Sequence, residues 1–261
     1  MPTWDAKQYL RFNEERIRPC RDLAARVAVT APVRIIDLGC GPGNSTAVLA
    51  ERWPQADLTG MDSSPEMIAA ARQTEPRLGW RIGEITAWAD EHGQPYDVVF
   101  SNAALQWVAD HKALFPKLLN RVTPGGAMAV QMPGNYSAPA HCLMREMAAS
   151  RAWRGCFPVA VREWHVEDLR TYHDILAPKA AAMDIWETEY LHILPDAAAI
   201  VEWYKGTGLR PFLDALSSDE MRAAFTAEYL ERICRAYPCR TNGCVIFPFR
   251  RLFLIAYQHP L

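Results

Sequence analysis

The sequence predicts an α/β fold with a doubly wound, mostly parallel sheet of seven strands. Short apolar runs alternate with helical patterns between residues 33 and 132, as expected for parallel strands joined by crossover helices. A glycine-rich turn separates the first apolar run from the first helical pattern. Two further strand patterns come late in the chain and bring the expected number of strands to seven.

Local patterns place the elements of the first half of the chain. The segment Ser63-Ser-Pro-Glu66 supplies a cap and an early proline for one helix, and Pro124-Gly-Gly126 is a turn before a strand. Early strands are expected at residues 33–37, 57–61, 78–83, 96–101 and 126–132. Helices are expected between them at residues 45–53, 65–74 and 111–121.

The flanking regions are predicted to be mostly helical. Residues 3–30 predict two helices, and Pro19 suits the start of the second. Residues 138–177 look mostly helical, whereas residues 183–193 alternate apolar and polar side chains as a half-buried strand does. The last elements are expected to be helices at 196–205, 209–216 and 218–236, and a terminal strand at 245–257.

Composition limits the classes of partner. The chain has 261 residues with 28 basic and 30 acidic side chains, and this balance argues against nucleic acid as a partner. We expect no membrane partner and no signal peptide, since no apolar run reaches spanning length and the first residues include an acid. The seven cysteines suit a reduced, cytoplasmic protein. Cys234, Cys239 and Cys244 lack a fourth ligand of any standard arrangement, so we expect no metal.

The glycine-rich turn is the first candidate for a functional site. Gly39, Gly41 and Gly43 follow a β-branched apolar run, and Asn44-Ser-Thr46 can cap the helix behind them. Such a turn directs backbone N–H groups and a helix N-terminus at a ligand, and glycine lets the backbone approach closely. Glycines at these spacings also occur in purely structural turns and in nicotinamide sites, so the turn alone does not identify the ligand.

Two aspartates sharpen the pattern. Asp37 stands two residues before the first glycine, and Asp62 ends the second strand, where a ribose diol would lie. The spacing Asp-Leu-Gly-Cys-Gly-Pro-Gly, followed by this second acid, resembles the first two motifs of class I S-adenosylmethionine-dependent methyltransferases. The resemblance implies a Rossmann-like fold and S-adenosyl-L-methionine as the cofactor.

The resemblance also assigns residues to the cofactor. Glu84 stands where the family usually has aspartate near the adenine, and Trp107 can face the sulfonium or simply pack at a helix start. The expected cofactor-binding residues are Asp37, Gly39, Cys40, Gly41, Gly43, Asp62, Ser63, Met67, Glu84, Ile85, Asn102, Ala103 and Trp107.

We expect a single methyltransferase domain over residues 1–261. Residues 1–30 are its N-terminal helices, and residues 31–135 are the cofactor-binding half. Residues 136–180 and 195–243 are two helical cap insertions over the carboxyl ends of the strands, where open α/β sheets bind ligands.

Motifs along most of the chain resemble the trans-aconitate 2-methyltransferase family. They include Leu105-Gln-Trp107, Gln131-Met-Pro133, Asp184-Ile-Trp186 and Thr207-Gly-Leu-Arg-Pro211. The resemblance implies methyl transfer to one carboxylate of a small polycarboxylate, which gives a monomethyl ester. A carboxylate is already ionised at neutral pH, so we expect no catalytic base, only positioning by Trp107 and Arg210.

The acceptor residues are expected to be binding groups. Arginine forks suit carboxylates, and tyrosine or histidine can donate hydrogen bonds, although each of these side chains has an alternative role in packing or a surface ion pair. His173 departs from the family pattern, where a second tyrosine is expected. The expected substrate-binding residues are Trp4, Tyr9, Tyr136, Tyr172, His173, Arg210 and Arg251.

Three other functions stay open at this point. The chain can methylate another acidic acceptor such as a thioester-carried dicarboxylate, or it can bind S-adenosylmethionine without turnover. A nicotinamide-dependent dehydrogenase would be distinguished by stabilisation with NAD rather than with the sulfonium cofactor. The oligomeric state is open, and a monomer is compatible with the sequence.

Overall fold

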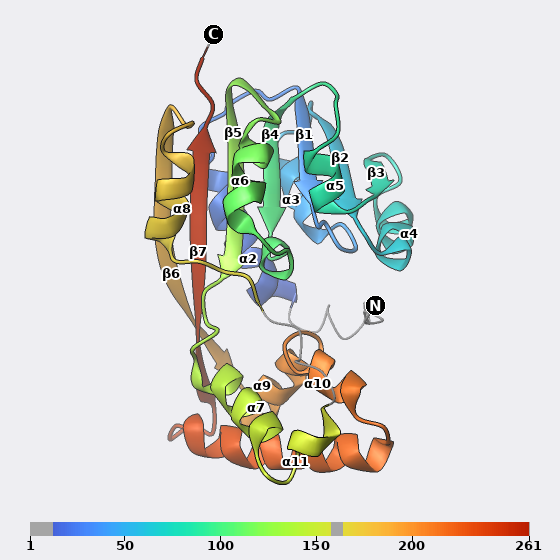
Figure 1. Cartoon of the computed structure of the whole chain (residues 1–261), viewed down its shortest axis with the longest axis vertical. Coiled ribbons are helices and arrows are strands. Elements are labelled where there is room, and N and C mark those ends of the chain that lie inside the picture. The colour runs from blue at the N-terminus through green and yellow to red at the C-terminus, as the bar shows by residue number, and fades with distance from the viewer. Residues whose placement is uncertain (1–12, 158–163, 261) are drawn as a thin grey trace. The chain divides into compact units, whose positions relative to one another are not determined.

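The computed structural model describes residues 13–157 and 164–260 (Figure 1). The chain divides into two compact units. Of the described residues, the sheet unit comprises residues 14–133, 164–188 and 251–260, and the helical unit comprises residues 13, 134–157 and 189–250. The expected caps 136–180 and 195–243 therefore coincide only in part with the helical unit, since residues 164–188 belong to the sheet unit.

Within the described residues, seven strands form one sheet in the order β3-β2-β1-β4-β5-β7-β6. Strands β1 to β5 pair in parallel, and β7 pairs antiparallel to β5. The predicted fold class is confirmed, because this is a mostly parallel sheet with helices on both faces. The strands are β1 (Arg34–Leu38), β2 (Asp57–Asp62), β3 (Gly79–Ile82), β4 (Tyr96–Asn102), β5 (Val122–Pro133), β6 (Ala182–Leu194) and β7 (Val245–Tyr257).

Helices cover both faces of the strands in the sheet unit (Figure 1). The helices α5 (Ile85–Ala89), α6 (His111–Leu119) and α8 (Leu169–Leu176) pack on one face, in a core with Val130 and Leu254 of the strands. The opposite face is covered by α2 (Asn13–Arg26) and α3 (Asn44–Arg52). The helix α4 (Pro65–Thr74) connects β2 to β3.

Helix α2 corrects one expectation from the sequence. Pro19 lies inside this helix, so the prediction that a helix starts there was wrong. Ile17, Cys20 and Val27 are all buried at helical spacing, so the apolar face continues through the proline. This burial outweighs the backbone hydrogen bond that proline removes. The first helix expected within residues 3–30 falls largely outside the described residues.

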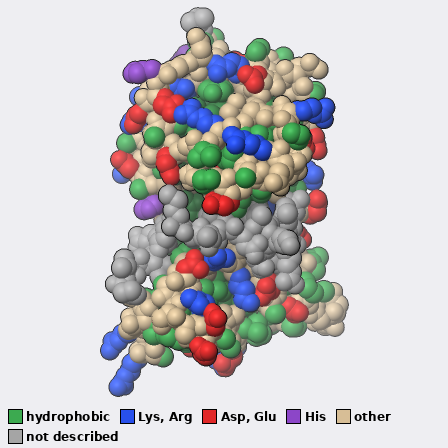
Figure 2. All heavy atoms as spheres, turned by 90° about the vertical axis from the view of Figure 1, so that its right-hand side faces the viewer, with side chains coloured by type: hydrophobic (Ala, Val, Ile, Leu, Met, Phe, Trp, Pro, Cys, Tyr) green, Lys and Arg blue, Asp and Glu red, His purple; other side chains and the backbone are tan. Residues whose placement is uncertain are grey.

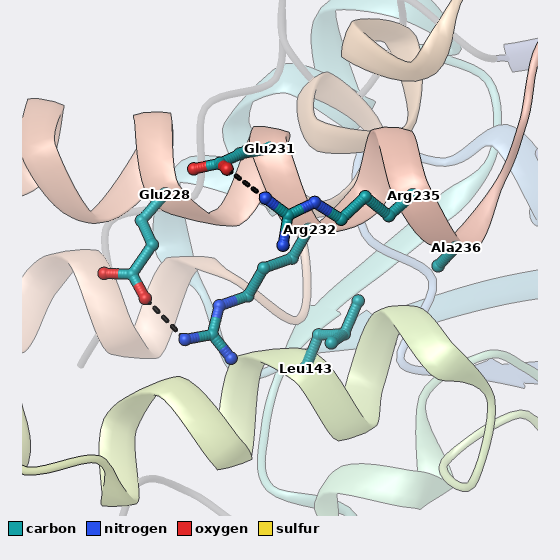
Figure 3. A pocket seen from close by; sticks show the side chains of 6 residues that line it. All are labelled: Leu143, Glu228, Glu231, Arg232, Arg235 and Ala236. Atoms are coloured by element: carbon teal, nitrogen blue, oxygen red, sulfur yellow. Dashed lines mark hydrogen bonds and ion pairs between the residues drawn. The ribbon is translucent and has the colours of Figure 1, made fainter.

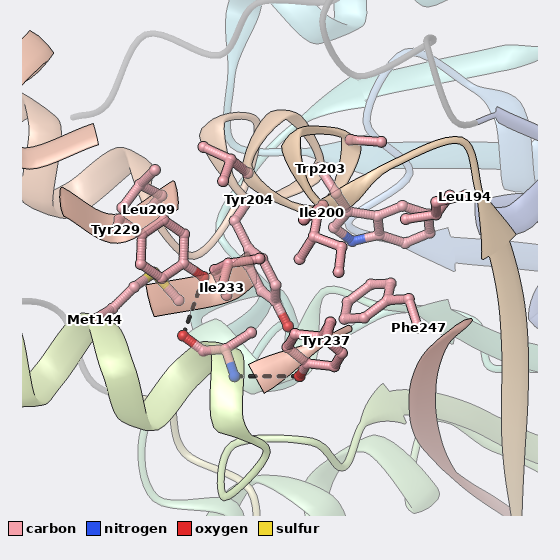
Figure 4. Packing of buried hydrophobic residues seen from close by; sticks show 14 of the residues in the cluster. Met144, Leu194, Ile200, Trp203, Tyr204, Leu209, Tyr229, Ile233, Tyr237 and Phe247 are labelled. Atoms are coloured by element: carbon pink, nitrogen blue, oxygen red, sulfur yellow. Dashed lines mark hydrogen bonds between the residues drawn. The ribbon is translucent and has the colours of Figure 1, made fainter. Parts of the chain in front are cut away.

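The helical unit has its own apolar core (Figure 4). Tyr229 donates a hydrogen bond to the backbone oxygen of Ala140 (3.0 Å), and the hydroxyl of Tyr237 accepts one from the Ala140 amide (3.2 Å). Both tyrosines therefore fix the first turn of α7 while their rings fill the core. The described α-helices of this unit are α7 (Pro139–Ala149), α9 (Ala197–Lys205), α10 (Arg210–Ala215) and α11 (Asp219–Ala236).

The surface shows no segregation of charge on the face in Figure 2, where the described acidic and basic side chains are interspersed. Among the described helices, none is long and apolar enough to cross a bilayer.

Candidate functional site

The turn between β1 and α3 has the backbone that its glycines allow. Gly39, Gly41 and Gly43 have φ angles of +73°, +56° and +96°, in the left-handed region that favours glycine. A Cβ atom on Gly39 would lie 2.2 Å from the Cβ of Ala104, whereas one on Gly41 would meet no atom of the described residues within 4 Å. The turn is thus closed on the side of Gly39 and open above Gly41, where a ligand can approach the backbone.

The cap expected at Asn44-Ser-Thr46 is absent from the described structure of this turn. Gly43 occupies the N-cap position and makes no side-chain cap bond. The hydroxyls of Ser45 and Thr46 instead donate to one oxygen of Asp37, at 2.6 and 2.7 Å. A buried carboxylate competes successfully for these hydroxyls because a charge-assisted hydrogen bond is stronger than a neutral one.

Asp37 is the buried acid of this site. Its side chain is fully buried, and its Oδ1 atom has no hydrogen-bond partner among the described residues. Burial raises the pKa of Asp37 to about 6, against the opposing effect of the hydrogen bonds from Ser45 and Thr46. An unpartnered carboxylate oxygen in a buried position suits a cationic or N–H group of a ligand.

Asp62 at the end of β2 is held beside the glycine turn. The Gly41 amide donates to its Oδ2 atom and the Ser64 amide donates to its Oδ1 atom, both at 2.9 Å. Each carboxylate oxygen keeps a second lone pair, so the oriented group can accept from two hydroxyls of a diol. Ser64 also caps α4 by accepting from the Met67 amide at 3.2 Å, as the sequence indicated.

The remaining cofactor candidates differ in their exposure. Cys40 and Met67 are buried, and Ser63 and Ile85 are half-buried. The Ile85 side chain approaches within 3.9 Å of the position that a Cβ on Gly39 would take, so it lies beside the turn. Glu84 is exposed at the N-cap of α5, where it makes no side-chain cap bond.

The loop after β4 forms the next part of this edge. Ala103 has a φ of 55°, a conformation that costs free energy in a residue other than glycine and that occurs often at functional sites. Its amide donates to the backbone oxygen of Gln131 (2.9 Å), and its own oxygen accepts from Gln106 Nε2 (2.7 Å). Trp107 packs edge to face on Trp164, with ring centroids 5.8 Å apart. These contacts hold the loop in place at the carboxyl ends of β4 and β5.

The comparisons with known proteins agree with this arrangement. A family model described as a methyltransferase domain matches residues 35–126. A trans-aconitate 2-methyltransferase from Azoarcus sp. (strain BH72) is 48% identical, with 99% of this chain and 100% of the relative covered. The chain belongs to the trans-aconitate 2-methyltransferase family. A second member, from Variovorax paradoxus (strain S110), is 44% identical, with 99% of each chain covered.

A solved structure supports the fold of this family member. The YcgJ protein from Bacillus subtilis superposes with a TM-score of 0.60 at 11% identity, covering 94% of this chain and 100% of that protein. At this identity the likeness shows the fold alone.

Two acceptor candidates of this trans-aconitate 2-methyltransferase family member lie in α8. Tyr172 is fully buried, and its hydroxyl lies 2.6 Å from His111 Nδ1 and accepts from the Glu167 amide at 3.0 Å. This is the packed role that the sequence left open for a tyrosine, and it joins α8 to α6. His173 is exposed next to Asp174, at 3.3 Å.

The other acceptor candidates are divided between the two units. Arg251 belongs to the sheet unit, opposite Pro133 of β5, and its side chain is 4% exposed. Arg210 is the first residue of α10 in the helical unit, where it forms an ion pair with Asp214 at 3.1 Å. Tyr136, in the same unit, is exposed beneath the guanidinium of Arg145 at 3.9 Å. Trp4 and Tyr9 lie outside the described residues.

A groove on the helical unit was not anticipated from the sequence (Figure 3). It lies between α7 and α11, and its lining includes Arg232, paired with Glu228 at 2.6 Å, and Arg235, paired with Glu231. These pairs neutralise its charges, so it has the character of a solvated helix face rather than of an anion site.

Sequence reasoning missed Gln131 of β5, which is fully buried, as a site candidate. A signal existed for it, because Gln131 interrupts the apolar run Ala127-Met-Ala-Val130 of a central strand. The sequence also offers Arg16 as a weaker candidate for carboxylate binding than Arg210, and in the structure Arg16 lies in α2 and is 8% exposed.

Proposed function

We propose that this chain is an S-adenosylmethionine-dependent O-methyltransferase that forms the monomethyl ester of trans-aconitate. The observation that carries the proposal is the match of 48% identity over nearly the whole of both chains to a relative named for this activity. The glycine turn with its two aspartates supports the same conclusion, because its atoms fit the polar groups of the cofactor.

The fit to S-adenosylmethionine can be followed from the described side chains. Asp37 Oδ1 is buried and without a partner in this part of the chain, so it suits the amino group of the methionine portion. Asp62, oriented by two backbone amides, suits the ribose diol. The left-handed turn at Gly41 leaves space for close approach, and Ile85 adds apolar surface at the side of the turn. Glu84 and Trp107 are proposed to contact the adenine and the sulfonium.

The chemistry asks little of acid or base residues. S-Adenosylmethionine supplies a sulfonium-bound methyl group, which passes to a carboxylate oxygen of the acceptor while the electron pair of the S–CH3 bond returns to sulfur. A carboxylate has an ordinary pKa of about 4 and is ionised at neutral pH, so no residue has to remove a proton. The protein therefore contributes by binding, orienting and desolvating the acceptor.

Binding of the acceptor is assigned to basic and aromatic side chains. Arg210 and Arg251 are proposed to bind carboxylates, because a guanidinium grips a carboxylate at two points. Tyr136, His173, Trp4 and Tyr9 stay proposed contacts on the strength of the family resemblance. Tyr172 is left out of the proposal, since its hydroxyl already bonds within the sheet unit.

The test is a methyl-transfer assay with a panel of di- and tricarboxylates, with the ester position read by NMR. We expect one methyl ester of trans-aconitate per S-adenosylhomocysteine formed, and slower transfer to dicarboxylates. Binding of the cofactor without ester from any free acid would contradict the proposal. In that case a thioester-carried dicarboxylate or a binding role without turnover becomes the better description.

A further inference from the structure

The starting observation is the fully buried carboxamide of Gln131 in β5. Neither its Oε1 nor its Nε2 atom has a hydrogen-bond partner among the described residues. Its neighbours Val130 and Met132 belong to the core beneath α6. Since side chains alternate along a strand, Gln131 points to the opposite face, the one covered by α2 (Figure 1).

Asn102 of β4 is a second polar side chain beside Gln131. It is paired in register with Gln131, and its Oδ1 atom is also buried without a partner in the described structure. Val99 faces the α6 core, so Asn102, three residues further, points to the same face as Gln131. Two neighbouring strands thus present unpartnered amide atoms side by side.

The orientation of α2 brings Arg16 over the same region. The Ala28 amide, just beyond the end of α2, donates to Tyr257 at the amino-terminal side of the parallel strands (3.0 Å). Earlier in the helix, Cys20 lies near Asp37, whose charge helps to raise the pKa of this thiol after the larger effect of burial. Helix α2 therefore runs from the carboxyl ends of the strands towards their amino ends.

The position of Arg16 along the strand axis follows from the direction in which α2 runs. Asp37 is in register with Phe100, one strand repeat before Asn102. Arg16 is one helical turn before Cys20, or about 6 Å along the helix, and the strand repeat is about 6.6 Å. From this spacing we infer that the buried residue Arg16 lies at about the level of Asn102 and Gln131 along the strands.

Arg251 lies on β7, the strand on the side of Gln131 away from β4. Gln131 is in register with Phe253, and Pro133 with Arg251. Leu254 faces the α6 core, so Phe253 and Arg251 both point to the α2 face. Arg251 is 4% exposed. From the register and the direction of α2 we infer that the buried residues Arg16 and Arg251 lie on either side of Gln131 at the carboxyl ends of the strands, all within the sheet unit.

We propose that Gln131 donates a hydrogen bond from Nε2 to a carboxylate of a bound ligand, in a subsite flanked by Arg16 and Arg251. An amide buried with both ends unpartnered destabilises the free protein, and a polar ligand removes that cost. Guanidinium and amide N–H groups are all hydrogen-bond donors, and carboxylate is the anion that such donors bind together. The inference rests on the proposed function, whose two ligands both carry carboxylates: the acceptor, and the methionine portion of the cofactor.

The test uses two variants of similar size, Gln131→Met and Gln131→Glu, in the full-length protein. Cofactor affinity is measured by calorimetry with S-adenosylhomocysteine, and acceptor affinity by titrating trans-aconitate into the protein saturated with that product. Because both readouts are binding, they stand even if the wild-type protein makes no ester, which would count against the proposed function alone.

We expect Gln131→Met to weaken one of the two ligands at least about tenfold, as the loss of a hydrogen bond to a charged group does. Its melting temperature without ligand should not fall, because the variant removes an unpartnered amide. Gln131→Glu should weaken the same ligand further by repulsion between carboxylates. Weaker trans-aconitate binding assigns the subsite to the acceptor, and weaker cofactor binding assigns it to the methionine carboxylate.

A control variant separates this effect from the removal of any buried polar atom. Ser150 Oγ, in the helical unit, is also buried without a partner among the described residues, and Ser150→Ala should change neither affinity. The inference is overturned if Gln131→Met binds both ligands within twofold of the wild-type protein. It is also overturned if Gln131→Glu binds both as well as Gln131→Met does, since a nearby carboxylate would then be absent.

Discussion

Asp37→Asn tests the electrostatics of the buried acid. The substitution keeps the shape of the side chain and an acceptor oxygen for Ser45 and Thr46, and it removes the charge. The pKa of Asp37 is raised from 3.8 to about 6, chiefly by burial. At 1.36 kcal/mol per pKa unit, this difference corresponds to about 3 kcal/mol of destabilisation when the group is ionised.

The direction with pH follows from the raised pKa. The folded state binds the proton of Asp37 more tightly than the unfolded state does, so the contribution to stability is fully present below pH 3.8. It is lost as the pH rises through about 6. Asparagine does not ionise, so the variant does not lose stability in this way as the pH rises. Its buried side-chain N–H group lowers the stability of the variant, but by the same amount at every pH. Its free energy of unfolding should therefore rise relative to the wild-type protein between pH 4 and pH 7, by about 2 kcal/mol, which is most of the full difference.

Urea unfolding of both proteins at pH 4, 5, 6, 7 and 8 measures this difference. Subtracting the two curves cancels the titration of all other groups, so only the pH dependence of the difference matters. A difference that stays constant within about 0.5 kcal/mol across this range would show that Asp37 does not titrate as its burial implies.

Three further substitutions address the ligands. Asp62→Ala should weaken S-adenosylmethionine binding by at least about tenfold in calorimetry with the fold retained, and unchanged affinity would remove Asp62 from the ribose site. Gly41→Val should abolish binding, because a branched side chain at a φ of +56° strains the turn by about 1–3 kcal/mol and fills the open approach. Arg210→Lys should lower kcat/KM for trans-aconitate about a hundredfold at unchanged cofactor affinity, and equal activity would exclude a two-point grip.

Most elements could be predicted because their signals are local. Helix α4, with its serine cap and Pro65, was placed at both ends, and β6 within one residue, because each combines hydrophobic periodicity with end signals. Pro19 misled because the preference of proline for helix starts is a local rule, and burial of α2 on the sheet overrides it.

The site was less predictable where it depends on contacts between distant residues. The sequence suggested Tyr172 as a hydrogen-bond donor to the substrate. In the structure its hydroxyl forms a hydrogen bond with His111, 61 positions earlier in the chain, within the core. Ser45 and Thr46 were expected to cap the helix, yet their hydroxyls donate hydrogen bonds to the buried Asp37. The ion pair of Arg210 with Asp214 could have been read from the sequence, since residues four apart share one helix face.

If Asp37 binds the amino group of the cofactor as proposed, we expect it to couple cofactor binding to the release of protons. In the free protein its carboxyl group is about half protonated at pH 6, and the ammonium group of S-adenosylmethionine at Oδ1 would lower that pKa. Binding at pH 6 should therefore release about half a proton, and binding at pH 8 almost none. Calorimetry in two buffers of different ionisation enthalpy measures the release, with Asp37→Asn as the control. Equal release from the wild-type protein and the variant would mean that the ammonium group lies elsewhere.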